Sequence, residues 1–243
     1  MDADIVKPDD LRIIFNHVPK AGGSSINRMF VDIFGEDKWF RHRARNPKTD
    51  QFSPAIGTLS TEELSEFRFI TGHFEYGNHR RLPGFAVKYI GAIRDPFDLL
   101  VSDYFYNQER GSAKNKALAS SLSFEQYVQQ KLDNPKSTMV LSHQIKRLTG
   151  TFDLDEAKRI VTEEYLVCAT TPQLNEMQKW LADYFGRPDL SPKHVNVSRK
   201  SKERRDPDLG DALRERLDNN YRLDRKLYTW VSEQFDTKVN GRG

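Results

Sequence analysis

A glycine-rich loop at residues 19–25 holds the first residues of the chain that could do chemistry. Adjacent glycines let the backbone approach an oxyanion closely, and N–H groups at the start of the next helix point toward such an anion. A lysine adds positive charge and two serines add hydroxyl donors. An ordinary glycine turn capped by serine is the alternative, but the position between a strand and a helix favours an anion site. Its predicted members are Lys20, Ala21, Gly22, Gly23, Ser24 and Ser25.

The order of residues separates this loop from the phosphate loop of nucleoside triphosphatases. In that motif, G-x-x-x-x-G-K-[ST], the lysine follows the glycines, whereas Lys20 precedes them. Triphosphate chemistry also uses an acidic magnesium ligand near a strand end, and the third apolar run instead ends at Arg94. A P-loop-like nucleotide kinase or hydrolase is therefore kept only as an alternative.

A second anion site is predicted where the apolar run 86–93 ends. Arg94 follows this run, and Ser102 lies about two turns along the next helix. A guanidinium fork and a hydroxyl can hold one phosphate between them. Taken alone, Arg94 could equally pair with Asp98 or Asp103. Together, two anion sites on neighbouring strand ends suit a nucleotide with phosphates on both its 5′ and 3′ positions.

These motifs resemble those of the sulfotransferases that use 3′-phosphoadenosine 5′-phosphosulfate (PAPS). The sequence PKAGGSS at residues 19–25 is similar to the family's 5′-phosphosulfate loop, and IRDPFDLLVSDYFY at 93–106 is similar to its 3′-phosphate motif. The likeness is greatest to the carbohydrate branch that includes heparan sulfate uronyl 2-O-sulfotransferase. Two departures are modest: Ala21 replaces a common threonine and Leu99 a common arginine.

The resemblance implies PAPS as donor, 3′,5′-ADP as product and no metal. It also implies that the late basic loop closes over the nucleotide through Ser198, Arg199 and Lys200. Sulfuryl transfer is an in-line displacement in which negative charge grows on the leaving phosphate oxygen. Lys20 is predicted to stabilise that charge and so to be catalytic as well as donor-binding.

The acceptor hydroxyl must lose a proton, which a group titrating near neutrality accepts best. His73 is the preferred general base, because it follows the second apolar run and Gly72 and because it matches the family position. Glu75 is the next candidate. His17 is predicted to stabilise the loop beneath Lys20.

Composition limits the partners and the cell compartment. The 243 residues carry a formal charge of +3 from 38 basic and 35 acidic side chains, so no overall field favours nucleic acid. A single cysteine, Cys168, excludes an internal disulfide, and the sequence has neither a signal peptide pattern nor an apolar run long enough to span a membrane. We therefore expect a cytoplasmic protein with no membrane span.

The elements that position these residues alternate between strands and helices. Strands are predicted at residues 12–18, 67–71, 86–93 and 165–170, with amphipathic helices between and after them. Asp95 is a predicted helix N-cap, and Ser123 with Gln126 resembles a capping box. The long C-terminal helix, residues 209–235, is expected to break near residues 219–220. This alternation predicts an α/β fold: a P-loop-like three-layer sandwich with a central, mainly parallel sheet flanked by helices. One sulfotransferase domain is expected over residues 1–243. Long loops are expected at residues 42–58, 110–122 and 191–209.

The acceptor is expected to be a hydroxyl on a sugar or glycan, but the sequence does not identify it. Five arginines would suit an anionic sugar: Arg41, Arg43, Arg45, Arg80 and Arg81. The oligomeric state is not predicted. A nucleotide-binding or glycan-binding module without turnover is the non-enzymatic alternative, and His73 beside two donor motifs argues against it.

Overall fold

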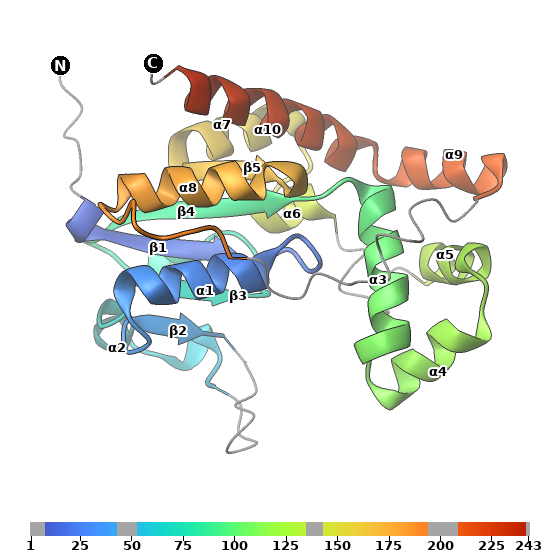
Figure 1. Ribbon diagram of the computed structural model, residues 1–243, viewed down its shortest axis with the longest axis horizontal. Coiled ribbons are helices and arrows are strands. Elements are labelled where there is room, and N and C mark those ends of the chain that lie inside the picture. The colour runs from blue at the N-terminus through green and yellow to red at the C-terminus, as the bar shows by residue number, and fades with distance from the viewer. Residues whose placement is uncertain (1–7, 43–52, 135–142, 194–208, 242–243) are drawn as a thin grey trace.

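A five-stranded, fully parallel sheet forms the centre of the protein (Figure 1). The computed structural model describes residues 8–42, 53–134, 143–193 and 209–241. The strands lie in the order β2-β3-β1-β4-β5. Their bounds are β1 Leu11–Asn16, β2 Trp39–Arg41, β3 Phe69–Gly72, β4 Ala86–Ile93 and β5 Tyr165–Thr170. Because β1 lies between β3 and β4, the carboxyl ends of these three strands open on one edge.

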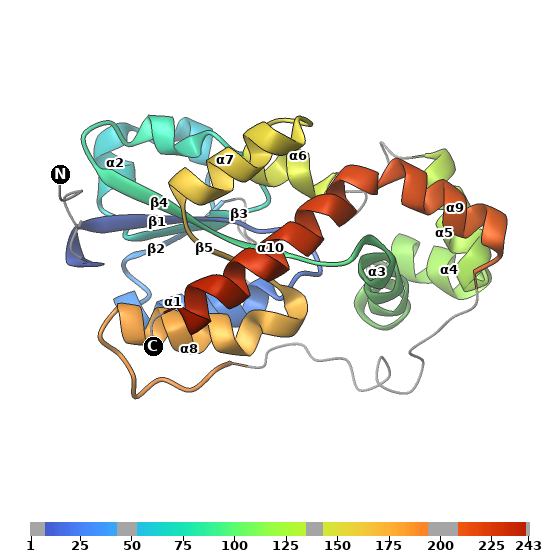
Figure 2. The ribbon, with the colours of Figure 1, turned by 90° about the horizontal axis from the view of Figure 1, so that it is seen from above.

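Helices cover both faces of the sheet, which confirms the predicted α/β sandwich. Figure 2 shows α1 (Gly23–Phe34) and α8 (Leu174–Tyr184) on one face, and α6 (Gln144–Thr149) and α7 (Leu154–Glu164) on the other. The long helix α10 (Arg222–Asn240) lies along β5. Strand residues that face both layers, such as Ile13 and Ile14, are fully buried.

The four predicted strands are present, and the prediction missed β2. Strand β2 has only three residues and joins the sheet edge through β3, where Phe40 lies opposite Ile70. A strand this short carries too few alternating positions for the sequence to signal it. It matters for the site because its end positions His42 beside the third strand.

Several helix ends are set by the residues that the sequence indicated. Asp95 caps α3 (Pro96–Arg110), with its carboxylate accepting from the N–H groups of Phe97 and Asp98. Ser123 and Gln126 form the predicted capping box of α5 (Phe124–Asp133). The predicted break near residues 219–220 separates α9 (Asp211–Asn220) from α10.

The prediction of a loop at residues 110–122 was wrong. This segment contains α4 (Ala113–Ser121), which Ser112 caps by accepting from the N–H of Asn115. Helices α3, α4, α5 and α9 form a group beside the sheet (Figure 1), with a second hydrophobic cluster that includes Leu100, Tyr127 and Leu217. The remaining helix, α2 (Thr61–Ser65), precedes β3. Among the described residues, no helix combines the length and apolar character needed to cross a membrane.

Candidate active site

A cavity of about 1120 Å³ lies at the carboxyl ends of β1, β3 and β4. This edge is where parallel α/β sheets bind ligands. The cavity brings together residues from every predicted part of the site that the structure describes. The predicted residues that line it are Lys20, Gly22, Gly23, Ser24, Ser25, His73, Arg94 and Ser102. Ala21 is buried and does not line the cavity.

The anion loop has a tight backbone that only glycine permits at two positions. Gly22 has a φ of 82°, and a Cβ there would lie 2.2 Å from Cδ1 of Leu174. A Cβ on Gly23 would lie 1.9 Å from Nε2 of His17, so this glycine admits the imidazole beside the start of α1. Lys20 also has a positive φ, of 64°, which costs free energy for a residue with a side chain. The loop is therefore a close-fitting backbone cradle.

The Lys20 side chain lines the cavity, and its ammonium contacts an aromatic ring. Its Nζ lies 3.4 Å from the ring centroid of Tyr106, a cation–π contact. Burial lowers the pKa of Lys20 to about 8; the charge of Asp103 opposes this shift and that of Arg94 adds to it. The ammonium is thus partly desolvated, which strengthens its attraction for an anion.

Arg94 is fixed against the anion loop. Its Nη1 donates to the backbone carbonyl of Lys20 over 2.9 Å, which ties the two predicted anion sites together. The Gln144 side chain pairs with the backbone of Arg94, accepting from its N–H at 2.9 Å and donating to its carbonyl at 2.7 Å. Burial lowers the pKa of Arg94, although Asp98 and Asp95 counteract it. The buried Nε of Arg94 has no hydrogen-bond partner among the described residues.

Asp103 does not pair with Arg94, which settles one alternative left open by the sequence. Its carboxylate accepts a 2.6 Å hydrogen bond from the Tyr127 hydroxyl and lies 3.8 Å from Nζ of Lys131. Asp103 nevertheless lines the cavity. The other alternative, Asp98, stays open, since its charge raises the pKa of Arg94 against the effect of burial.

His73 is held in a defined tautomer. Its Nδ1 lies 2.8 Å from the backbone carbonyl of His17. A carbonyl oxygen only accepts, so Nδ1 carries the hydrogen and Nε2 keeps a lone pair that can accept a proton. The ring stacks on His17 with centroids 4.4 Å apart. Burial lowers the pKa of His73, and the hydrogen bond to His17 partly offsets the effect.

The two other candidates for proton chemistry are placed differently. His17 touches the cavity, but desolvation by burial, followed by the charge of His73, lowers its pKa to about 3. It lies under the anion loop against Gly23, where the sequence analysis placed it. Glu75 is not among the residues that line the cavity, whereas His73 is. Geometry therefore favours His73 over Glu75.

Several cavity residues escaped the sequence analysis. Thr171, Pro172 and Asn175 come from the end of β5 and the start of α8, and Lys193 comes from the segment after α8. Because ligands lie at the carboxyl ends of parallel strands, the end of the predicted fourth strand was a usable signal. The described residues contain no cluster of His, Cys, Asp or Glu that could hold a metal ion. Ser198, Arg199 and Lys200 lie outside the described residues.

Sequence comparison identifies the family to which this α/β fold and its cavity belong. Residues 3–230 match the profile of the sulfotransferase family. The chain belongs to that family and is a sulfotransferase enzyme.

Characterised relatives are similar over nearly the whole chain. Heparan sulfate 2-O-sulfotransferase hst-2 of Caenorhabditis elegans is 23% identical over 259 residues, covering 92% of this chain and 78% of the relative. Heparan sulfate 2-O-sulfotransferase 1 of Mus musculus is 22% identical over 267 residues, covering 96% and 73%. Uronyl 2-sulfotransferase of Homo sapiens is 24% identical over 267 residues, covering 95% and 64%.

Proposed function

We propose that this enzyme transfers the sulfuryl group of PAPS to a carbohydrate hydroxyl by in-line displacement, with His73 as general base. One observation carries the proposal: the Lys20 loop, Arg94 and His73 converge on one cavity from the ends of three adjacent parallel strands. Each group has a separate role in such a reaction.

The donor side fits a nucleotide with two anionic ends. The cradle at residues 20–25 suits the 5′-phosphosulfate, because it combines close-approaching backbone with the Lys20 charge. Arg94 and Ser102 both line the cavity and suit the 3′-phosphate, because a guanidinium fork and a hydroxyl can hold one phosphate between them. PAPS would supply the activated sulfur–oxygen bond. Lys20 would then stabilise the charge that develops on the leaving phosphate oxygen.

The acceptor side needs a group that removes the hydroxyl proton. Nε2 of His73 keeps its lone pair because Nδ1 donates to His17, and the lowered pKa keeps the ring neutral near pH 7. During transfer the proton moves from the acceptor oxygen to Nε2. The His17 carbonyl would then stabilise the imidazolium through the hydrogen bond it already accepts.

A sugar is the acceptor that the relatives favour, since they are named for heparan sulfate and for uronyl groups. Arg41, at the end of β2, is among the arginines expected to suit an anionic sugar; its guanidinium stacks on Trp39. The hydroxyl that is sulfated is left to experiment. Labelled PAPS tested against heparan-type glycans, neutral glycans, lipids and small alcohols would identify the acceptor class.

The donor assignment is tested by thermal shift without magnesium. At a hundredfold excess over its Kd, 3′,5′-ADP should stabilise the protein by about 2.7 kcal/mol relative to the unliganded state. ADP and ATP at the same concentration should stabilise it far less. Arg94→Ala should reduce the difference between 3′,5′-ADP and ADP. Equal shifts for the two nucleotides in the unmodified protein would remove the argument for a dedicated 3′-phosphate site.

A further inference from the structure

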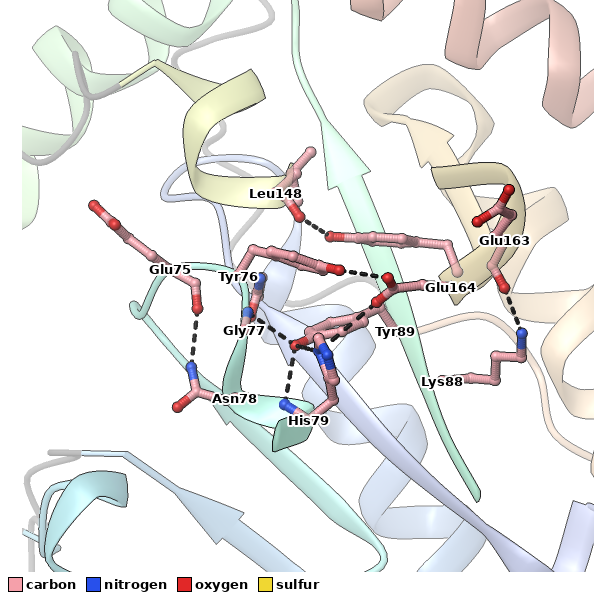
Figure 3. A network of polar contacts seen from close by, with 12 residues as sticks. Glu75, Tyr76, Gly77, Asn78, His79, Lys88, Tyr89, Leu148, Glu163 and Glu164 are labelled. Carbon is pink, nitrogen blue, oxygen red and sulfur yellow. Dashed lines mark hydrogen bonds and ion pairs between the residues drawn. The ribbon is translucent and has the colours of Figure 1, made fainter. Parts of the chain in front are cut away.

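The segment that carries His73 continues as residues 73–81 across the sheet face that α6 and α7 cover, and we name it the base loop. His73 itself is held at one end by His17. The other end contacts a partly buried polar network that is outside the cavity (Figure 3). The proposed transfer reaction gives this network no direct role.

The hydroxyl of Tyr89 is the centre of this network. Tyr89 lies on β4 and is 1% exposed. Its oxygen accepts from the backbone N–H of Gly77 at 3.1 Å and from that of His79 at 3.2 Å. It also lies 2.9 Å from Nδ1 of His79 (Figure 3). Three groups of the base loop therefore meet one tyrosine oxygen.

The hydrogens and lone pairs of these groups determine the direction of each hydrogen bond. A phenol oxygen has two lone pairs and one hydrogen. The two backbone N–H groups occupy the lone pairs, so the hydrogen of Tyr89 is donated to Nδ1 of His79. His79 is then neutral with its own hydrogen on Nε2. The hydroxyl is fully used, and its removal would leave two partly buried backbone donors without that acceptor.

Tyr76 ties the same loop to α7 and α6. Its hydroxyl donates to Oε1 of Glu164 over 2.5 Å, and its N–H donates to the Arg147 carbonyl over 3.0 Å. That carbonyl also accepts from Nδ2 of Asn16. Asn16 directly precedes His17, whose carbonyl holds the His73 ring. The His73 ring is thus held by His17, and Tyr76 is linked through the Arg147 carbonyl to Asn16, the neighbour of His17 and the last residue of β1.

We propose that Tyr89 and Tyr76 are positioning residues for the general base: they fix the base loop so that the His73 ring keeps its hydrogen bond to His17. This role rests on the proposed function of His73. Neither tyrosine lines the cavity, so neither is expected to contact donor or acceptor. Their loss should therefore affect turnover and leave donor binding intact.

Tyr89→Phe is the principal test, and Tyr165→Phe is its matched control. Tyr165 is equally buried and stacks on Tyr89, but its hydroxyl donates to the Leu148 carbonyl on α6 and not to the base loop. With labelled PAPS and 2-O-desulfated heparan sulfate, Tyr89→Phe should lower kcat about 10-fold to 100-fold, because small misplacements of a catalytic group are that costly. KM for PAPS should stay unchanged. Tyr165→Phe should keep kcat within about threefold of the unmodified enzyme.

Two results would overturn the proposal: equal kcat values for Tyr89→Phe and Tyr165→Phe, or a loss of 3′,5′-ADP binding in Tyr89→Phe that matches its loss of kcat. If Tyr89→Phe fails to fold, Tyr76→Phe replaces it, since this side chain is only partly buried and its removal spares the Tyr89 hydroxyl. A smaller fall in kcat, about threefold to 10-fold, is then expected. An unchanged kcat would overturn the proposal.

A measurement that does not require catalysis tests this inference separately from the proposed function. NMR of labelled histidine should show the signal of the Nδ1–H tautomer of His73 in the unmodified protein and in Tyr165→Phe, and its loss to a mixture of tautomers in Tyr89→Phe. If the unmodified protein transfers no sulfuryl group, the proposed function fails while this signal still reports on positioning. Retention of the signal in Tyr89→Phe would overturn the inference even in an active enzyme.

Discussion

Around Lys20 the cavity is shaped by backbone from a single stretch of sequence, whereas the position of His73 depends on groups that are distant in the sequence. The anion loop owes its form to Gly22, Gly23 and the positive φ of Lys20, all within four residues. His73 depends on the carbonyl of His17, and its loop depends on Tyr89 and Glu164. The donor half is local in sequence and the base half is not.

This difference reflects what each half must do. An anion cradle needs many donors at close range, which consecutive N–H groups and a helix start provide. A general base needs one nitrogen, in one tautomer, at one place, and that requires contacts from several sides. Variants in the two halves should therefore differ in which kinetic constant they change.

The largest effect is expected from His73→Ala. Turnover should fall roughly 10²-fold to 10⁴-fold, the usual contribution of a positioned base, while 3′,5′-ADP binding stays normal because the donor loop is untouched. Steady-state kinetics and calorimetry would measure the two properties. Glu75→Gln is the control, since Glu75 does not line the cavity. Normal turnover in His73→Ala with a large loss in Glu75→Gln would make the base a carboxylate.

Gly23→Ala should damage the donor half through packing. The added methyl would overlap the His17 ring, so we expect a loss of about 1–3 kcal/mol in the free energy of unfolding and weaker 3′,5′-ADP binding. Denaturant unfolding and thermal shift would measure both. Gly57→Ala is the matched control, because no atom lies within 4 Å of the Cβ it would add. Similar stability of the two variants would show that the loop is not close-fitting.

The pH dependence of kcat/KM should report on both His73 in the base half and Lys20 in the donor half. The rate should fall on the acid side as His73 gains a proton. This fall should lie below pH 6.5, the ordinary pKa of a histidine, because burial lowers the pKa of His73. It should fall again above about 8, where Lys20 loses the proton that gives it charge. Each limb approaches a tenfold change per pH unit. In Lys20→Arg the alkaline limb should vanish, and its persistence would assign it to another group.

The smallest effect is expected at Tyr106. Tyr106→Leu removes the aromatic face under the Lys20 ammonium, worth about 0.5–1 kcal/mol at an exposed site, so turnover should fall roughly twofold to fivefold. The alkaline limb should also move to lower pH, since the ammonium loses a stabilising contact. Tyr106→Phe keeps the face and should behave as the unmodified enzyme. Equal losses in both variants would assign the effect to the hydroxyl instead.

The sequence alone determined the features that depend on neighbouring residues. The order of Lys20 and the glycines, the cap at Asp95 and the capping box at Ser123 each need contacts across only a few positions, and the structure contains the cap and the box as predicted. The parallel sheet followed from the alternation of strand and helix patterns. The helix at residues 113–121 was missed because its polar sequence lacks an apolar stripe.

Only the tertiary structure decided how the base is held and which side chains complete the cavity. The tautomer of His73 depends on a carbonyl 56 positions away, and the support of Arg94 depends on Gln144, 50 positions away. Tyr76 reaches Glu164 across 88 positions. No local pattern encodes such pairs, because they form only when the sheet order brings β1, β3 and β4 together and α6 and α7 pack on them. Local chemistry therefore fixed the donor loop, and long-range packing fixed the geometry of the base.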